Sequence, residues 1–452
     1  MDLNHFFFKY AAYYPVAFLK TKGFFKQLKK LEKSQYYSYK EIDQIRVKKL
    51  KALIEFSRNN VPFYRNTLRD IKSVDIHSVK DIANIPFITK ASLKNTDNKF
   101  VPQQKEWFLT NRTTGGSTGQ PVTIQKTRQA MAAELAATWR GYSWAGINIG
   151  KKQARFWGVP LSNFGKFNGW LTDKICHRIR LSAFSFNDES LMEYTKKMKS
   201  FKPDYFYGYV SMLCDYARFC SNKLDNMPIS PGCIITTAEV LSSSQKELLQ
   251  RVFKTKVYNE YGCGELGTIA HECEHGNMHI SAENMIVEIL DGNRVCKDGE
   301  IGEIVVTELN NFAMPLIRYR LGDFGALSSI SCPCGRTLSV LKDVKGREYD
   351  IIKTKDGRYY HGEFFMYIFE EAERKGLGVE KFQIKQLTLQ YILIKIVPSE
   401  NYNVYVEQLI TEKIYEQLGN NITIKFEFVD DIPREKSGKM RLIIGMDSIP
   451  SE

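Results

Sequence analysis

The sequence contains no run of about eighteen consecutive apolar residues, so it predicts no transmembrane helix. The opening residues are aromatic, but Lys9 and Pro15 interrupt them, and they lack both a basic lead and a small-residue cleavage site, so we expect no signal peptide. Cysteine is sparse as well. Nine cysteines at irregular spacing in 452 residues argue against a disulfide framework and for a reducing compartment. We therefore expect a cytoplasmic protein.

The composition is that of a soluble globular protein, with 43% hydrophobic and 25% charged residues. A chain of 452 residues is too long for one ordinary core, so we expect at least two domains. The formal net charge of +13 indicates an anionic partner, such as a nucleotide, coenzyme A, nucleic acid or an acidic membrane. The positive residues are dispersed and form no known nucleic-acid-binding motif, so we expect no nucleic-acid partner.

The segment from Lys20 to Lys33 carries six lysines and one glutamate among aromatic and leucine residues. It has two interpretations. It could rest on an acidic membrane surface, which would make the protein peripheral at the inner face of the membrane. The favoured alternative is an amphipathic helix packed on the flank of a domain.

The pattern of apolar residues divides the chain into regions of different character. Residues 1–100 are mainly helical, with a helix that ends before Pro62. The middle of the chain has an α/β pattern, whereas residues 391–399 and 422–430 look like strands that flank a helix over 404–418. We predict an α/β protein with a large N-terminal domain of mixed sheets and helices, residues 1–345, and a small mobile α+β domain, residues 346–452.

One βαβ unit is recognisable in the middle region. An apolar strand (Cys233–Ile235) is followed by the turn Thr236–Glu239, a helix capped by a serine cluster, and a second strand that leads into Tyr261 and Gly262. A right-handed crossover makes the two strands parallel neighbours. The loops 236–239 and 259–265 therefore lie side by side at the carboxyl ends of strands, where open α/β sheets bind ligands.

Four motifs are suited to a nucleotide. The loop TTGGSTGQP (Thr113–Pro121) lets backbone amides approach phosphate closely, although Gln120 stands where P-loop proteins have a lysine. In NEYGCGELG, Tyr261 can stack on adenine and Glu265 can hold Mg²⁺. In IRYRLGDFG, Asp323 can accept hydrogen bonds from a ribose. In IPREKSGKMR, a glycine-supported loop can deliver the charge of Lys439 to a transition state.

Cysteine and histidine are concentrated in two short segments. HECEHGNMHI contains Cys273, His275 and His279, and CPCG contains Cys332 and Cys334. Three thiolates and one histidine make a tetrahedral zinc site of structural type, with either His275 or His279 as the nitrogen ligand. The alternative is thiols that bind no metal.

In this order the motifs resemble those of the adenylate-forming superfamily of acyl-CoA synthetases and adenylation domains. The sequence looks most like the branch of phenylacetate–coenzyme A ligases and the related CapK-like proteins of capsular polysaccharide biosynthesis. The stretches NNVPFYR, IPFITK and KPDYFYGY extend the resemblance over nearly the whole chain. It implies an enzyme that uses ATP and Mg²⁺ to convert a small carboxylic acid to an acyl-adenylate and then transfers the acyl group.

The resemblance also implies the roles of individual residues. Lys439 and Glu265 would be catalytic, with Glu265 as the magnesium ligand. Zinc would be held by Cys273, His279, Cys332 and Cys334, with His275 as the alternate ligand. The residues implied to bind ATP or AMP are Thr113, Thr114, Gly115, Gly116, Ser117, Thr118, Gly119, Thr237, Ala238, Glu239, Asn259, Tyr261, Gly262, Asp323 and Arg347.

Two departures from the family pattern and two alternatives stay open. Gly264 stands where the family has a hydroxyl residue, and Tyr349 stands where it has a hinge aspartate. An inactive nucleotide-binding relative is therefore an alternative to an enzyme. The implied acceptor is coenzyme A, and the alternative is an amine or hydroxyl of a glycan precursor. The oligomeric state, a dimer included, and the identity of the acid do not follow from the sequence.

Overall fold

The computed structural model describes residues 7–94, 99–103, 108–113, 122–157, 163–182, 188–223, 229–347, 351–355, 359–361, 365, 368–369, 371–372, 375–434 and 440–446. Among these residues no helix combines the length and the apolar character that crossing a membrane requires.

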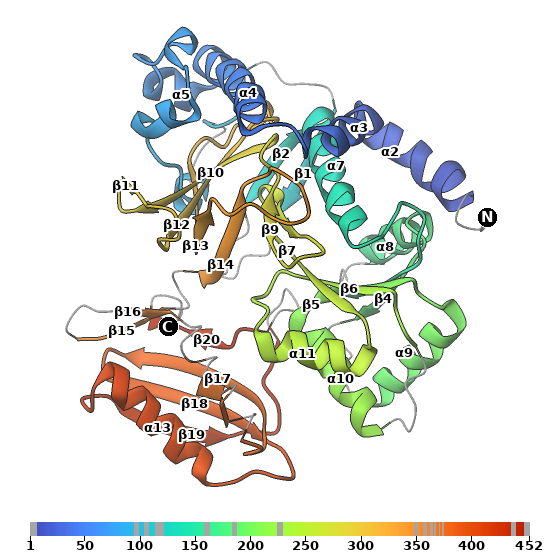
Figure 1. The fold of residues 1–452 in the computed structure, drawn as a ribbon, viewed down its shortest axis with the longest axis vertical. Helices are drawn as coiled ribbons and strands as arrows, with labels where there is room; N and C mark the ends of the chain where they lie inside the picture. Colours follow the sequence, from blue (N-terminus) through green and yellow to red (C-terminus); the bar gives the residue numbers. More distant parts are fainter. Residues whose placement is uncertain are drawn as a thin grey trace.

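Helices dominate the beginning of the chain, as predicted (Figure 1). The Ser38 side chain and Glu41 form a capping box that starts the longest of these helices, and Pro62 occupies the first turn of the next one, where its missing N–H is not needed. The elements are η1 (Phe8–Tyr13), α2 (Tyr14–Lys20), α3 (Phe24–Ser34), α4 (Tyr39–Asn60), α5 (Pro62–Thr67), η2 (Ser73–Asp75), η3 (Val79–Asn84) and α6 (Lys90–Lys94).

The largest sheet contains twelve of the described strands, in the order β11-β10-β12-β13-β14-β9-β8-β7-β6-β5-β3-β4. The strands from β4 to β7 run parallel, and from β7 onward neighbouring strands run antiparallel. The strands are β3 (Gln153–Trp157), β4 (Arg178–Ser182), β5 (Tyr205–Tyr209), β6 (Cys233–Thr237), β7 (Lys256–Cys263), β8 (Gly267–Glu272), β9 (Met278–Ile280), β10 (Met285–Asp291), β11 (Arg294–Val295), β12 (Gly302–Glu308), β13 (Tyr319–Ser328) and β14 (Val340–Arg347). A separate hairpin is formed by β1 (Leu109–Thr113) and β2 (Thr123–Thr127).

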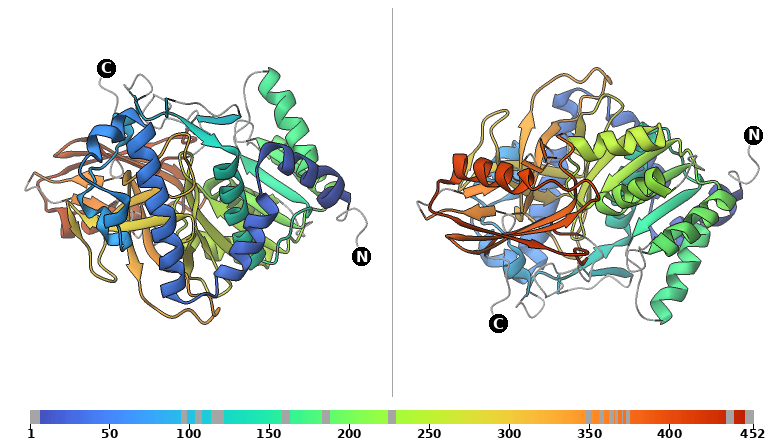
Figure 2. Two further views of the ribbon diagram at one scale, coloured as in Figure 1. Left: turned by 90° about the horizontal axis from the view of Figure 1, so that it is seen from above. Right: turned by 90° about the horizontal axis from the view of Figure 1, so that it is seen from below.

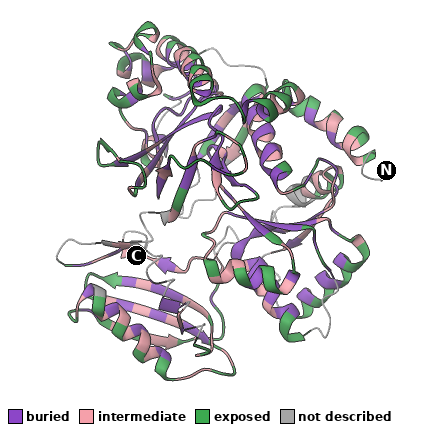
Figure 3. Cartoon of the chain, in the orientation of Figure 1, coloured by how far each residue is buried: buried purple, intermediate pink, exposed green. Residues whose placement is uncertain are grey.

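Helices cover both faces of the parallel part of this sheet, because its strands are apolar on both faces. One face packs on α9 (Asp188–Phe201), α10 (Val210–Lys223) and α11 (Ser243–Phe253). The other face packs on α7 (Arg128–Trp144), near which α8 (Asn163–Ile175) lies (Figure 1). Figure 3 shows the resulting pattern, with buried strands between helices whose outer sides are exposed.

The predicted βαβ unit is confirmed. Strand β6 pairs with β7 in parallel, with α11 between them in the sequence. The predicted serine cap is Ser242, and Gln245 completes its capping box. The loops that follow β6 and β7 thus lie side by side, as predicted.

The last part of the chain builds a second, smaller sheet, in the order β19-β18-β17-β20. We refer to the described residues 351–446 as the C-terminal region. Its apolar core is made only of residues from this region, and the other cores contain none of them. Its elements are β15 (Ile351–Lys353), β16 (Tyr359–His361), β17 (Val379–Thr388), β18 (Tyr391–Pro398), α13 (Tyr405–Leu418), β19 (Thr423–Phe428) and β20 (Ile443–Ile444).

The views in Figures 1 and 2 place the C-terminal region beside α10 and α11. The predicted fold class, an α/β protein with a mixed sheet and an α+β C-terminal part, is confirmed. The domain boundary near residue 345 stays a prediction.

Candidate active site

The candidate nucleotide site lies at the carboxyl ends of β6 and β7. Thr237 is the last residue of β6, and Ala238 follows it with a positive φ of 69°, which turns the chain sharply away from the sheet. Asn259 of β7 pairs with Thr236, whose hydroxyl lies 3.1 Å from the Asn259 side-chain oxygen. The residues predicted to surround adenine are therefore neighbours in space.

Tyr261 and Asp323 also meet, although 61 residues separate them in the sequence. The Tyr261 hydroxyl donates a hydrogen bond of 2.8 Å to Oδ2 of Asp323. Asp323 lies in β13 after Gly322, whose φ is +75°, and it pairs with Arg347 of β14. The predicted adenine-stacking residue and the predicted ribose ligand thus belong to one cluster. The backbone of Arg347 lies beside them, and its side chain lies outside the described part of the structure.

Glu265 lies in the turn between β7 and β8 and is 4% exposed. Its carboxylate accepts one long hydrogen bond, 3.4 Å, from the Tyr319 hydroxyl. A buried carboxylate fits a hard cation such as Mg²⁺, which takes oxygen ligands. Gly262 allows this tight turn, because a Cβ there would lie 2.4 Å from the carbonyl oxygen of Gly267. Gly264, one of the two departures from the family pattern, is exposed in the same turn.

A buried lysine, which the sequence analysis did not predict, supports this turn. Lys126 of β2 is 0% exposed, and its ammonium group donates to the carbonyl of Leu266 at 3.1 Å, next to Glu265. It also pairs with Glu308 at 2.9 Å and with Glu134 at 3.1 Å. Burial lowers the pKa of Lys126, but Glu308 and Glu134 together raise it above its ordinary value. Lys126 therefore stays charged and connects the hairpin to the turn that carries Glu265.

The predicted phosphate loop is only partly described. Thr113 ends β1 and pairs with Thr123 at the start of β2. Its side chain lies outside the described residues, as do Gln120 and all of the remaining predicted loop residues, Thr114, Gly115, Gly116, Ser117, Thr118 and Gly119.

The C-terminal region touches the candidate site at Glu239. The backbone N–H of Met440 donates to Oε1 of Glu239 at 3.0 Å, and the backbone N–H of Ser211 donates to Oε2 at 2.7 Å. Burial raises the pKa of Glu239, and these hydrogen bonds oppose the shift. Lys439 precedes Met440 and, like Tyr349, lies outside the described residues. Met440, the residue that follows the SGK motif in the sequence, is thus bound beside the end of β6.

A second contact was missed by the sequence reasoning. Arg434 donates to the Ser211 hydroxyl at 2.6 Å and to Asp215 Oδ2 at 2.7 Å, both on α10. We call this contact, together with that of Met440 with Glu239, the junction. Arg434 belongs to the IPREKSGKMR motif, so its position in the motif was the one available signal.

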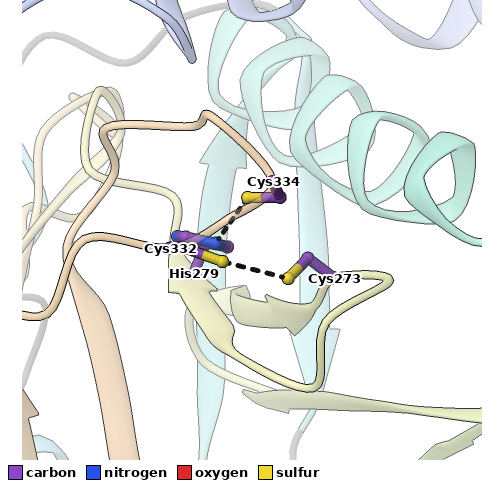
Figure 4. A group of neighbouring side chains, drawn as sticks. All are labelled: Cys273, His279, Cys332 and Cys334. Atoms are coloured by element: carbon purple, nitrogen blue, oxygen red, sulfur yellow. Dashed lines mark hydrogen bonds between the residues drawn. The ribbon is translucent and has the colours of Figure 1, made fainter.

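The Cys/His segments come together as a compact cluster. Cys273, His279, Cys332 and Cys334 place their ligand atoms within 4.8 Å of one another, and Figure 4 shows the four side chains converging. Cys273 Sγ lies 3.6 Å from Cys332 Sγ, and Cys334 Sγ lies 3.2 Å from His279 Nε2. Zn–S bonds of about 2.3 Å in a tetrahedron set S–S separations of about 3.8 Å, so the cluster fits zinc.

The surroundings of this Cys/His cluster also fit a metal site. His279 Nδ1 bonds to the carbonyl of Leu338 at 2.9 Å, which leaves Nε2 directed at the thiols. Asn277 donates to Cys332 at 3.2 Å, and the backbone N–H of His275 donates to Cys273 at 3.4 Å. Of the two candidate histidines, His279 is thus in the ligand cluster. His275 lies beside the cluster, where its backbone N–H contacts the Cys273 thiol.

Comparison with known proteins identifies the relatives of this chain. Residues 352–446 match the CapK C-terminal domain family. Protein CapK of Staphylococcus aureus is 23% identical over 94% of this chain and 92% of that protein. A phenylacetate–coenzyme A ligase of Thermus thermophilus is 22% identical over 88% of this chain and 95% of that protein.

The solved structures give the same result. A crystal structure of 2-hydroxyisobutyryl-CoA ligase in the postadenylation state, in complex with 2-HIB-AMP, superposes with a TM-score of 0.74 at 18% identity, covering 91% of this chain and 90% of that one. The chain has the fold of an adenylate-forming ligase. The resemblance predicted from the motifs is confirmed.

The arrangement of the two parts can be compared as well. The same ligase in the thioesterification state, in complex with 2-HIB-AMP and coenzyme A, gives a TM-score of 0.58 at 19% identity, with 91% of each chain covered. Since coverage is the same within a percent, the higher score of 0.74 for the postadenylation state indicates that the C-terminal region is arranged more as in that state.

Proposed function

We propose that this protein activates a carboxylic acid with ATP, forming an acyl-adenylate, and then transfers the acyl group to an acceptor. The observation that carries the proposal is the junction: the amide of Met440, the residue after Lys439, is bound to Glu239 at the end of β6. Glu239 follows β6, whose neighbour β7 carries Tyr261, the hydrogen-bond partner of Asp323, so the residue next to Lys439 is bound near the proposed nucleotide ligands.

In the first step, a carboxylate oxygen of the substrate attacks the α-phosphorus of ATP, and pyrophosphate leaves. Both reactants are anions, so the barrier is lowered by positive charge at the reacting oxygens. Lys439 provides an ammonium group for this, and Glu265 would hold Mg²⁺, which neutralises phosphate charge. Tyr261 stacks on the adenine, and Asp323 accepts from the ribose hydroxyls.

In the second step, the acceptor attacks the carbonyl carbon of the acyl-adenylate, and AMP leaves. Coenzyme A is the proposed acceptor, since the named relatives include coenzyme A ligases. The alternative, an amine or hydroxyl of a surface-glycan precursor, draws support from the match to CapK. Swinging of the C-terminal region between the steps is supported by the separate apolar cores.

Zinc in the Cys/His cluster is proposed to have a structural role. The cluster ties the segment after β8 to the connection between β13 and β14. Strands β13 and β14 both contribute residues to the candidate site. The four thiol and imidazole groups would all be engaged by the ion, which leaves no open position for substrate.

A screen for pyrophosphate release tests the proposal. Aryl, fatty, amino and dicarboxylic acids would be tested singly with Mg-ATP, each with and without coenzyme A. Acid-dependent release with one class supports adenylation, and conversion to a thioester identifies the acceptor. ATP binding without release for any acid would indicate the inactive nucleotide-binding relative instead.

A peripheral membrane contact in a reducing compartment completes the proposal. All nine cysteines are free. The apolar side chains of Phe7, just before η1, and of Phe18 and Leu19 on α2 are 59%, 70% and 70% exposed. Lys26, Lys29 and Lys30 are exposed on α3, which packs its other face on α7. Apolar and basic groups side by side suit an anionic bilayer. Sedimentation with phosphatidylglycerol vesicles but not with phosphatidylcholine vesicles supports this contact, and equal sedimentation with both contradicts it.

A further inference from the structure

Two charged residues, the half-buried Arg155 and the buried Glu260, lie on the face of the parallel sheet that α7 covers, and the mechanism above uses neither. Arg155 is in β3 and Glu260 is in β7. Around them this face carries aromatic residues, among them Tyr207, Tyr142 and Trp157. Charged side chains that a helix covers need hydrogen-bonding or ionic partners, because an unpaired buried charge is strongly unfavourable.

Arg155 packs against two aromatic rings, and it forms no ion pair with an acidic residue in the part of the chain that the structure describes. Its guanidinium carbon lies 4.5 Å from the centre of the Trp157 ring and 4.8 Å from that of Tyr207. Its Nε is buried and has no hydrogen-bond partner among the described residues. Stacking of this kind fixes the plane of the guanidinium and leaves its edge free to bind an acceptor.

The strand next to Arg155 adds more positive charge. Arg155 pairs in register with Arg180 of β4, and Arg178 lies two residues before it. Arg178 and Arg180 both pair with the carboxylate of Asp173, at 2.5 Å and 2.9 Å respectively. Burial lowers the pKa of Arg155, and the nearby charge of Arg178 lowers it further. A negative charge near these three arginines, in addition to that of Asp173, would therefore be stabilised.

The Glu260 carboxyl group, on the same face of the sheet, is only partly hydrogen-bonded among the described residues. Its Oε1 accepts from the Tyr207 hydroxyl at 3.2 Å, but its Oε2 is buried and has no partner among the described residues. Burial raises the pKa of Glu260 to about 7. A phenyl ring or alkyl chain placed against Arg155 would leave its Nε without a hydrogen bond, at a cost of about 1–3 kcal/mol or more.

The register of the strands places Arg155 below the nucleotide site. Arg155 is level with Tyr207 of β5 and Ile235 of β6. Thr237, two residues beyond Ile235, is level with Glu260 and is followed by Ala238 and Glu239 of the proposed nucleotide site. Two residues of a parallel strand span about 7 Å, and the two strand spacings from β6 to β3 add about 10 Å across the sheet. The long side chain of Arg155 and an acid of a few carbons would together bridge this separation.

We propose that the acid activated by this protein is a short dicarboxylic acid, of about four to six carbons, whose second carboxylate binds Arg155. This inference rests on the proposed adenylation function and names its substrate class. Guanidinium and carboxylate form two parallel hydrogen bonds, which supply the missing partner of Nε and select for an anionic end. Arg155 is a specificity residue and takes no part in the bond-forming steps.

Pyrophosphate exchange with matched acids tests the inference. Succinate, glutarate and adipate would be compared with butyrate, pentanoate and hexanoate on wild-type protein and on Arg155→Met. We expect kcat/KM of the wild type to favour the best dicarboxylate by about 30- to 100-fold, as for a desolvated charge pair. In Arg155→Met that preference should vanish through a higher KM, with monocarboxylate rates within about threefold of the wild type.

A conservative variant separates specificity from folding. Arg155→Lys keeps the charge but not the fork of donors, so it should recover part of the preference. A wild-type preference for monocarboxylates, or an unchanged preference in Arg155→Met, would overturn the inference and leave the adenylation proposal standing. Absence of exchange with every acid, phenylacetate and amino acids included, would overturn both.

Discussion

The charged contacts inside the large sheet and those at the junction with the C-terminal region are built differently. Inside, the side chains of Lys126 and Glu308 are 0% and 4% exposed and pair under the strands. At the junction, the side chains of Arg434 and Asp215 are 11% and 13% exposed, and no apolar cluster of the described residues crosses from one side to the other. The interior contacts fix the strand ends, whereas the junction can separate without exposing a core.

This difference suits a two-step reaction. The residues proposed to bind the nucleotide are positioned by a rigid, buried network, and the proposed catalytic lysine comes from a part that is held by a few polar bonds. Changes to the interior should therefore alter the free energy of unfolding, and changes at the junction should reduce activity. Four substitutions test that contrast.

The largest loss of stability is expected for Lys126→Met. It removes the only described cation that contacts Glu308, whose buried carboxylate is then unpaired. We expect the free energy of unfolding to fall by about 3–5 kcal/mol. Urea titration would measure it, with Lys381→Met at the junction as a control that changes it by less than about 1 kcal/mol. Equal effects of the two substitutions would contradict the contrast.

We expect Glu260→Gln to raise the free energy of unfolding by an amount that depends on pH. Burial raises the pKa of Glu260 from 4.5 to about 7, so the folded state resists ionisation of this carboxyl. The wild type therefore loses stability as pH rises from about 4.5 through 7, and the loss is absent below 4.5. We expect Glu260→Gln to match the wild type at pH 4 and to exceed it by up to about 3 kcal/mol at pH 8. A stability difference between variant and wild type that does not vary with pH would show that the pKa of Glu260 is not raised, and it would contradict this prediction.

The Cys/His cluster gives a test by metal removal. Cys332→Ser removes one of the four proposed ligands, so zinc affinity should fall by more than about tenfold, the effect of losing even an outer-shell partner. Elemental analysis after dialysis and thermal unfolding would show less zinc and a lower Tm. Cys296→Ser, outside the cluster, serves as the control. Wild-type protein that holds no zinc after growth in zinc-supplemented medium would refute the zinc proposal.

The smallest effect on stability, with a measurable effect on rate, is expected for Arg434→Ala. The substitution removes the bonds to Ser211 and Asp215. Adenylation should slow by about ten- to a hundredfold, the value of charged hydrogen bonds, while unfolding changes by less than about 1 kcal/mol. Lys395→Ala, which breaks a pair wholly inside the C-terminal region, should leave the rate unchanged. A rate loss shared by both variants would speak against docking as the cause.

The sequence predicted what depends on neighbouring residues. The βαβ unit, its serine cap and the helix before Pro62 follow from local patterns of apolar, capping and turn residues. The Cys/His cluster followed from ligand spacing, and the structure favours His279 over His275 because its ring faces the thiols.

The contacts that the sequence did not predict join distant segments. The bond between Tyr261 and Asp323 depends on how the antiparallel strands after β7 fold back, and the bond between Glu239 and Met440 depends on docking of the C-terminal region. Lys126 and Arg155 were missed for another reason. A charged residue in a strand normally indicates a solvent-facing position, and only the three-dimensional partners reveal that Lys126 is buried and that Arg155 packs against aromatic rings.

The central claim is that Lys439, carried beside the strand ends by the junction, supplies charge to the adenylation step. Carboxylate-dependent exchange of pyrophosphate into ATP, compared between wild-type protein and Lys439→Ala, tests it most directly. Exchange should fall by a few hundredfold, equivalent to about 3–4 kcal/mol of barrier, while the Kd for ATP stays within about threefold. Undiminished exchange in Lys439→Ala would contradict the account.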